Sequence, residues 1–400
     1  MPRAAAAVRT VFSEGFRAFF LGAGLFAVVA MAIWWGWLLV QAAGGIADLP
    51  PAVPPFLWHG HEMVFGYGAA ALGGFFLTAV PNWTGAKAAP HRFVALAFGL
   101  WLVGRLAMWF GGSLPAGLIA LADLAFVPLL GAKILTQLLQ RPKPQNMVFL
   151  AVLAVYWLAN LSCHLEWMGL PGGDVWVGLR AGLAALAAMI VVLGGRVTPG
   201  FTRNAMVQSG REWGLPFNPA PLALAAGLSS GLLPLAYLLR LPEPATGALA
   251  VLAGGLALAR VALWRGGFTL DRPILWIMHL SYGLNGLGLA LMGLAGFGLG
   301  SEVAGLHVLA IGGVGGMTLA MMSRATLGHA GRPLIAPGPV VWAYACLPLA
   351  ALARWAGSAF PALYTPAVLV AGGLWLAAFA LYLAGLLEVF VTPRVSRSKG

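Results

Sequence analysis

The sequence predicts an all-α, polytopic membrane protein, a bundle of twelve transmembrane helices with both termini in the cytoplasm. Hydrophobic residues make up 60% of the 400-residue chain and charged residues only 8%. That is more apolar surface than one soluble core can bury. The apolar residues fall into runs of roughly 20, the length that crosses about 30 Å of hydrocarbon. Basic residues collect in alternate connections between these runs, which is how orientation in a bilayer is set.

Twelve apolar runs follow one another along the chain. Their limits are residues 17–42, 58–80, 93–111, 115–139, 147–168, 175–195, 218–239, 245–265, 273–298, 302–323, 339–357 and 361–390. The first run, from Ala18 to Val40, is too long for the core of a signal peptide and is therefore interpreted as the first span. Lipid offers no hydrogen-bond partners to the backbone and no run alternates like a barrel strand, so each run is expected to be helical. No connection is long enough for a soluble domain, and residues 1–400 form one integral-membrane domain.

The positive charge supports both the number of spans and their orientation. With both termini inside, all of the 23 Lys and Arg residues fall on the inner side except Arg105, Arg180, Arg240 and Arg354. If one span had been missed or wrongly added, every later connection would be assigned to the opposite side of the membrane. The strong bias in charge therefore supports the number of spans. The net charge of +12 thus reflects membrane topology, and no nucleic-acid partner is expected.

Several kinds of chemistry are excluded by the motifs that the chain lacks. No P-loop, GxSxG or HExxH sequence occurs, so soluble-enzyme chemistry has no visible site. Cys163 and Cys346 are the two cysteines, and neither belongs to a CxxC or CxxCH sequence. Thiolate metal sites and covalent haem are therefore not expected. Metal ligands, if present, must be His, Met or carboxylate.

The stretch "LWHGHEMVFGYG" places His59, His61 and Glu62 at the mouth of the second run. Ionisable groups inside a membrane are costly and mark functional sites by default. Residues i and i+2 of a helix point about 200° apart, so the two histidines can share a ligand only if the helix starts between them. The Pro54–Pro55 pair makes such a late start plausible. A third imidazole, from His307 in the tenth run, could then complete a set that suits copper, iron or zinc.

Two alternatives stay open for the same stretch. Glu62 could orient a ligating imidazole by accepting its other N–H, or it could carry protons. "WHGHE" could also be an interfacial anchor of Trp and His at the headgroups. His61 precedes Gly66 by five residues and His307 precedes Gly312 by five. The shared spacing in the second and tenth runs would fit a repeat with a period of four helices. With 55 glycines in the chain, such a match is weak support for a repeat.

Further polar residues lie in the later runs. The small residues around His307 permit either close helix packing or room for a bulky planar cofactor. His279 is a further candidate ligand, although Ser281, Tyr282 and Asn285 could satisfy it without a metal. The remaining candidates, His329, Arg196, Arg324 and Arg332, lie near inner connections. The arginines are either topology determinants or partners for haem propionates.

Two residues have a lower rank. His164, beside Cys163 at a helix end, is a weaker candidate ligand. Asp123, within the fourth run, is the nearest feature to the buried charge expected in a twelve-helix secondary transporter. No matched acidic pair accompanies it, so a transporter is the less favoured class.

Four stretches together resemble the NnrS family of bacterial inner-membrane proteins, which contain haem and copper and respond to nitric oxide. They are "FRAFFLGAGLFA", "WHGHEMVFGYGAAALGGFFLTAVPNWTG", "GGRVTPGFTRN" and "GGMTLAMMSRATLGHAGRPL". The resemblance implies a multi-pass protein of the bacterial inner membrane that holds non-covalent b-type haem and copper. The residues carried over are His59, His61, Glu62, Arg196, His307, Arg324, His329 and Arg332, with His279 from "HLSYG".

The resemblance favours a metal centre that binds nitric oxide and reduces it to nitrous oxide. Reduction needs protons, and Glu62 and Glu302 are the candidate carriers. It also needs electrons, for which quinol or a redox protein is the expected donor, since the chain has no iron–sulfur motif. The alternative is a metal-containing sensor or carrier of nitric oxide without catalysis.

Overall fold

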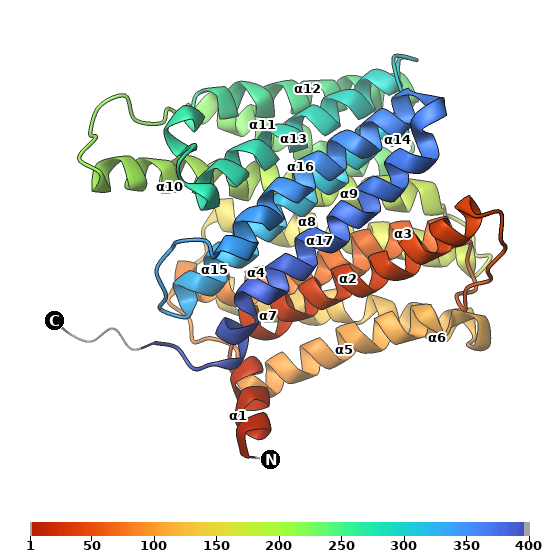
Figure 1. Cartoon of the computed structure of the whole chain (residues 1–400), viewed down its shortest axis with the longest axis horizontal. Coiled ribbons are helices and arrows are strands. Elements are labelled where there is room, and N and C mark those ends of the chain that lie inside the picture. The colour runs from red at the N-terminus through yellow and green to blue at the C-terminus, as the bar shows by residue number, and fades with distance from the viewer. Residues whose placement is uncertain (1, 396–400) are drawn as a thin grey trace. The chain divides into compact units, whose positions relative to one another are not determined.

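The computed structural model of the chain describes residues 2–395 and is helical, with no strand among them. Within this range, twelve helical segments are long and apolar enough to cross a membrane. This confirms the predicted all-α class and the predicted number of spans, and Figure 1 shows the helices. Arg397 and Lys399, two of the basic residues expected on the inner side, lie outside the described residues. A short helix that the sequence analysis did not predict, α1 (Pro2–Val11), precedes the first span.

The helices follow the predicted order. Spans one to five are α2 (Gly15–Ala42), α3–η1–α4 (Pro55–His61, Glu62–Tyr67, Gly68–Thr84), α5 (His91–Trp109), α6–α7 (Ala116–Leu124, Phe126–Leu138) and α8 (Pro144–Trp167). Spans six to nine are α9–η3–α10 (Val175–Met189, Ile190–Gly194, Gly195–Gln208), α11 (Ala220–Leu238), α12 (Glu243–Ala262) and α13 (Pro273–Ala295). Spans ten to twelve are α14–η5–α15 (Glu302–His307, Val308–Gly315, Gly316–His329), α16 (Gly338–Ala359) and η6–α17 (Pro361–Leu363, Tyr364–Val391). Short 3₁₀ turns, η2 (Gly111–Ser113) and η4 (Gly266–Thr269), lie in two connections.

Three helices run further than their apolar patterns indicate. The second, sixth and tenth spans end at Thr84, Gln208 and His329, well beyond the predicted limits at residues 80, 195 and 323. The polar stretches that follow these three apolar runs are thus helical themselves. The second span ends where Gly85 adopts a left-handed conformation with φ 72°, which glycine reaches without strain.

The same three spans each contain a π-helix, η1, η3 and η5. A π-helix bonds i to i+5, so it distorts the carbonyl ladder and is frequent at functional sites. It therefore exposes backbone carbonyls to donors from neighbouring helices. Side chains of neighbouring helices donate hydrogen bonds to carbonyls of both η1 and η3.

The chain forms two compact units. Of the described residues, unit 1 contains 2–182, 322–334 and 382–395, and unit 2 contains 183–321 and 335–381. In unit 1, α4 packs against α2 and α7, and α5 against α6. In unit 2, α13 packs against α12, α14 and η5. The chain passes from one unit to the other four times, within α9, within α15, in the connection between α15 and α16, and within α17.

Arg17 fastens the two ends of the chain together within unit 1. Its guanidinium is buried and its Nη1 donates to the carbonyl oxygens of Val389, Phe390 and Thr392 at 2.6, 3.2 and 2.8 Å. The last carbonyls of a helix have no intrahelical partner, so Arg17 acts as a C-terminal cap for α17. This gives the arginine of "FRAFF" a structural role.

Glycine lets helices approach closely in unit 2. A Cβ on Gly254 would lie 2.5 Å from the carbonyl oxygen of Gly286, and a Cβ on Gly313 would lie 2.7 Å from Cα of Asn285. Backbones this close are typical of small-residue packing in membranes. Of the two roles left open for the glycines after His307, close helix packing is the one that Gly313 serves.

Candidate metal centre

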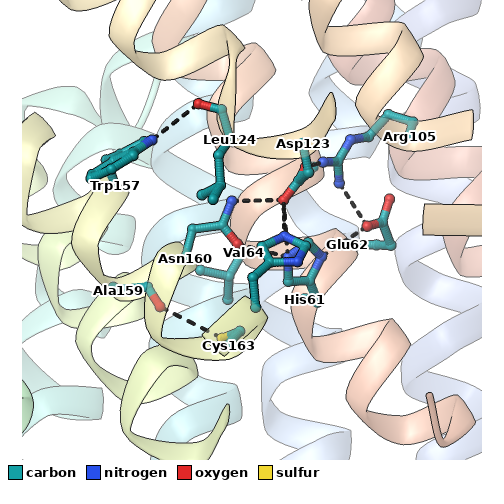
Figure 2. A network of polar contacts seen from close by, with 12 residues as sticks. His61, Glu62, Val64, Arg105, Asp123, Leu124, Trp157, Ala159, Asn160 and Cys163 are labelled. Carbon is teal, nitrogen blue, oxygen red and sulfur yellow. Dashed lines mark hydrogen bonds and ion pairs between the residues drawn. The ribbon is translucent and has the colours of Figure 1, made fainter. Parts of the chain in front are cut away.

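Polar side chains from four spans of unit 1 meet in one buried network (Figure 2). They come from α3–η1, α5, the end of α6, and α8. The members are His61, Glu62, Arg105, Asp123, Asn160 and His164, all less than 9% exposed. Because the chain has so few charged residues, a buried cluster of six polar side chains marks this region as a candidate functional site.

A helix break positions Asp123. Pro128 has no N–H to donate to the carbonyl of Leu124, four residues earlier, and the helix is interrupted at Ala125 between α6 and α7. Trp157 Nε1 of α8 donates to the freed Leu124 oxygen at 3.0 Å. Asp123 therefore lies at the end of α6, where its carboxylate faces α5 and α8 (Figure 2).

The π-helix η1 begins at Glu62, directly after His61. Two of its carbonyls take side-chain donors, Val64 from Tyr156 Oη at 2.6 Å and Gly66 from Trp101 Nε1 at 2.9 Å. Arg105 follows Trp101 by one turn on the same face of α5. A Cβ on Gly66 would lie 2.8 Å from Arg105 Nη1. Glycine at this position thus makes room for the guanidinium.

Arg105 joins the two carboxylates. Its Nη1 donates to Glu62 Oε1 at 2.6 Å, and its Nη2 forms an ion pair with Asp123 Oδ1. Asn160 Nδ2 donates to Asp123 Oδ2 at 2.7 Å. Two carboxylates therefore share one guanidinium, and the network carries one excess negative charge when the imidazoles are neutral. Burial makes such a charge costly unless a cation offsets it.

Three of the side chains could hold a metal ion. His61, Asp123 and His164 each offer one ligand atom, and these atoms lie within 4.8 Å of one another. Asp123 Oδ2 is 2.8 Å from His164 Nε2 and 3.3 Å from His61 Nε2. His61 Nδ1 lies 3.0 Å from Glu62 Oε1, which is the contact expected of a carboxylate that orients a ligating imidazole. Two imidazoles and a carboxylate suit copper, iron or zinc.

His59 and His61 point to different surroundings. The expected late helix start is wrong, because α3 begins at Pro55 and includes both histidines. Residues i and i+2 then diverge, as the helical period requires. The His59 ring stacks on Trp34 at 4.7 Å between centroids, whereas His61 faces Asp123.

His329 lies at the other end of α2 from His59. Its ring packs 5.6 Å from Phe16, and Phe16 and Trp34 are 18 residues apart on that helix, or about 27 Å. No single ion can bind both histidines. Arg332 donates to Glu388 Oε1 at 3.1 Å and to Thr392 Oγ1 at 3.4 Å. Arg324 belongs to the same unit and is half-buried.

His279 is one of the predicted site residues in unit 2. It is buried, and its Nε2 lies 2.8 Å from Thr202 Oγ1. Since Thr202 donates its own hydrogen to Thr198, the His279 ring donates to Thr202 through Nε2. Its Nδ1 is then a buried lone pair, with no hydrogen bond among the described residues.

His307 is the last residue of α14 before η5, as His61 is the last residue of α3 before η1. Its Nδ1 donates to the carbonyl of Val303 in its own helix at 2.8 Å. Nε2 then carries the lone pair of the neutral ring. Glu302 begins the same helix, next to its N-cap residue. Arg196, near the start of α10, is exposed.

Asp123, His164, Arg105 and Asn160 were missed or ranked low as site residues. Two features of the sequence could have identified Asp123 and Arg105 as site residues. Asp123 is a carboxylate inside an apolar run, and Arg105 is one of only four basic residues that the charge bias does not explain. An intramembrane acid and an arginine without a topological role are natural partners.

Twelve membrane-length helices and a buried cluster of imidazole and carboxylate groups define a multi-pass membrane protein with a candidate metal centre. The family described as NnrS protein has a model that matches residues 10–394. The chain therefore belongs to the NnrS family, as its motifs predicted, and membership implies a role in the nitric oxide response. No curated protein matches the chain.

Proposed function

We propose that this protein binds nitric oxide at a copper ion held by His61, Asp123 and His164, and that it reduces nitric oxide in the response to nitrosative stress. The observation that carries the proposal is the buried trio of ligand atoms within 4.8 Å in a chain of the NnrS family. The proposed setting is the bacterial inner membrane, with both termini in the cytoplasm.

The donor set and the charge of the network fit copper. Imidazole nitrogen is a good ligand for copper, and a bound cation would offset the excess negative charge of Glu62, Asp123 and Arg105. Copper supplies one-electron redox chemistry when it is bound. Glu62 would hold the His61 ring in place through Nδ1, so that Nε2 points at the ion.

The reduction consumes two nitric oxide molecules, two electrons and two protons and yields nitrous oxide and water. Glu62, in contact with both His61 and Arg105, is the proposed proton carrier at the site, and Glu302 is proposed for unit 2. The surrounding apolar helices keep water from the site. Electrons would come from quinol or from a redox protein.

Haem is proposed as a second group, and His307 is the residue that would hold it. The supporting observation is the hydrogen bond from His307 Nδ1 to Val303, which leaves Nε2 to bind iron, as in many haem and metal sites. Haem would supply a further one-electron centre. Within unit 2, His279, with a buried Nδ1 lone pair, is the other imidazole proposed for it, and Arg196 is the proposed propionate partner. In unit 1, His59 and His329 lie at opposite ends of α2 and could not hold the same group. Both histidines, with Arg324 and Arg332, stay predictions.

Metal analysis of the protein purified in detergent tests the copper site. His61→Ala, His164→Ala and Asp123→Asn should each lose copper, and Glu62→Gln should weaken copper binding about 10- to 100-fold, the usual cost of losing an orienting partner. His91→Ala, an exposed histidine at the start of α5, is the matched control. Full copper content in all three ligand variants would sink the assignment.

Exposure of the reduced protein to nitric oxide tests the reaction. Absorption spectroscopy reports binding, and gas chromatography reports nitrous oxide. Production of nitrous oxide by the wild-type protein, lost in His164→Ala, is the expected result. Binding without consumption would favour a sensor or carrier instead.

A further inference from the structure

A small cavity lies against the candidate metal centre in unit 1. Its volume is about 110 Å³, and its walls include Val53, Met108, Ala116, Ile119, His164 and Trp167. These residues come from the connection before α3, the end of α5, the start of α6 and the end of α8. His164, one of the proposed ligands, thus belongs to both the metal centre and the cavity wall.

The size and lining of the cavity restrict the kind of molecule that it can hold. One water molecule takes about 30 Å³ of liquid, and an engineered apolar cavity of about 150 Å³ in another protein binds benzene. The cavity therefore accepts a molecule of a few atoms, and it is too small for haem. Val53 and Ile119 offer no hydrogen bonds, Met108 offers only a weakly accepting thioether, and none of the three carries a charge. An uncharged, lipid-soluble molecule therefore suits this wall.

Trp167 adds a polar group to this wall. Its indole ring lies 5.1 Å from the ring of His61 and 5.2 Å from that of His164, centroid to centroid. Its Nε1 is buried and has no hydrogen-bond partner among residues 2–395. A buried N–H without an acceptor costs free energy, and an acceptor atom of a bound guest would remove that cost.

We infer that this cavity is the pocket in which nitric oxide lies when it reaches the metal centre, and that Trp167 donates a hydrogen bond to it through Nε1. Nitric oxide is uncharged and diatomic, and it carries acceptor atoms. The inference rests on the proposed function, and it assigns a substrate pocket and a positioning residue to that site.

Trp167→Phe tests the hydrogen bond, because it keeps an aromatic ring and removes the N–H. The dissociation constant for nitric oxide should rise about tenfold, the value of one hydrogen bond, and the infrared stretch of bound nitric oxide should shift. Trp58→Phe is the matched control, since Trp58 Nε1 is also buried without a partner but Trp58 does not line the cavity. It should leave both quantities unchanged.

Ala116→Phe tests the pocket itself by filling it. Xenon binds apolar cavities without needing a metal, so ¹²⁹Xe NMR should detect xenon in the wild type and in Leu118→Phe, but not in Ala116→Phe. Leu118 is exposed on the same helix, and it serves as the control for a bulky substitution. Nitric oxide should bind about tenfold more slowly to Ala116→Phe.

The two proposals fail in different ways. A wild type that holds copper and binds nitric oxide, with unchanged binding in Trp167→Phe and Ala116→Phe, overturns the pocket and leaves the metal centre standing. A wild type that binds no metal overturns both. Xenon binding that survives in Ala116→Phe also contradicts the pocket.

Discussion

Arg105 in unit 1 and Arg260 in unit 2 have similar backbone surroundings and different partners. Both are buried, and each guanidinium lies against a glycine at a π-helix, Gly66 in η1 and Gly195 directly after η3. In both cases a side chain with a Cβ would collide with the arginine. The π-helix and its glycine thus leave space for a guanidinium to lie directly against the helix backbone.

A tyrosine accompanies each arginine. Tyr156 Oη donates to the carbonyl of Val64 in η1, and Tyr282 Oη donates to that of Val191 in η3, at 2.6 and 3.3 Å. Each tyrosine comes from the third span after its π-helix, α8 in one case and α13 in the other. The two units therefore treat the distorted carbonyls of a π-helix alike.

The partners of the two guanidinium groups differ in charge. Arg105 pairs with two carboxylates. Arg260 donates only to neutral oxygens, and no described carboxylate pairs with it. Its acceptors are the carbonyls of Val191 and Gly195, the Tyr282 hydroxyl and the Asn218 amide. The same backbone arrangement therefore holds a guanidinium in two settings. In unit 1 the arginine belongs to a cluster with an excess of negative charge, and in unit 2 it links neutral oxygens of neighbouring helices.

Arg105→Gln should give the largest effect on stability. It leaves Glu62 and Asp123 buried without their cation, and breaking a buried ion pair in this way costs about 3–5 kcal/mol of the free energy of unfolding. Denaturant titration in detergent micelles measures the loss. Arg92→Gln, an exposed arginine on the same helix, should change little. Equal stability of the two variants would contradict the role of Arg105 as the cation that offsets two buried carboxylates.

Gly195→Ala should destabilise unit 2 by about 1–3 kcal/mol, the usual cost of overpacking. The new methyl group would displace the Arg260 guanidinium from the carbonyls that it caps. The same titration measures the change. Gly200→Ala, with open space around its Cβ position in the same helix, should be neutral or slightly stabilising. Destabilisation by Gly200→Ala of similar size would point to helix geometry rather than to Arg260.

Arg260→Gln should cost about 1–2 kcal/mol, less than Arg105→Gln, because it leaves only neutral groups behind. Val191 and Gly195 also keep other donors, Tyr282 Oη and Asn218 Nδ2. Parallel titrations of the two arginine variants check the order. A larger loss for Arg260→Gln would show that unit 2 hides an anion, and it would contradict a purely structural role for Arg260.

Tyr156→Phe should give the smallest resolvable effect, about 1 kcal/mol for one hydrogen bond. No other described side chain donates to the Val64 carbonyl, whereas Val191 retains Arg260 when Tyr282 is replaced. Tyr282→Phe should therefore cost less than Tyr156→Phe. Thermal unfolding of both variants beside the wild type measures this difference, and the reverse order would argue against it.

The site was only partly predictable. His61 and Glu62 stood out because two adjacent polar residues interrupt an apolar run. Asp123 and His164 lie 41 residues apart in sequence, and no local pattern links them. Their contact depends on the break at Pro128 and on the packing of α6 against α8, neither of which follows from hydropathy.

Hydropathy was enough to predict the class of protein and the number and order of its spans, because lipid forces each apolar run of sufficient length into a helix. Four sequence motifs were enough to identify the family. Which ionisable groups meet depends instead on how the helices pack. The tertiary structure separated His59 from His61 and brought His61 to Asp123 and His164. The reason is that helix phase, π-helices and helix breaks set the direction of a side chain, and a shift of one residue turns a helix by about 100°.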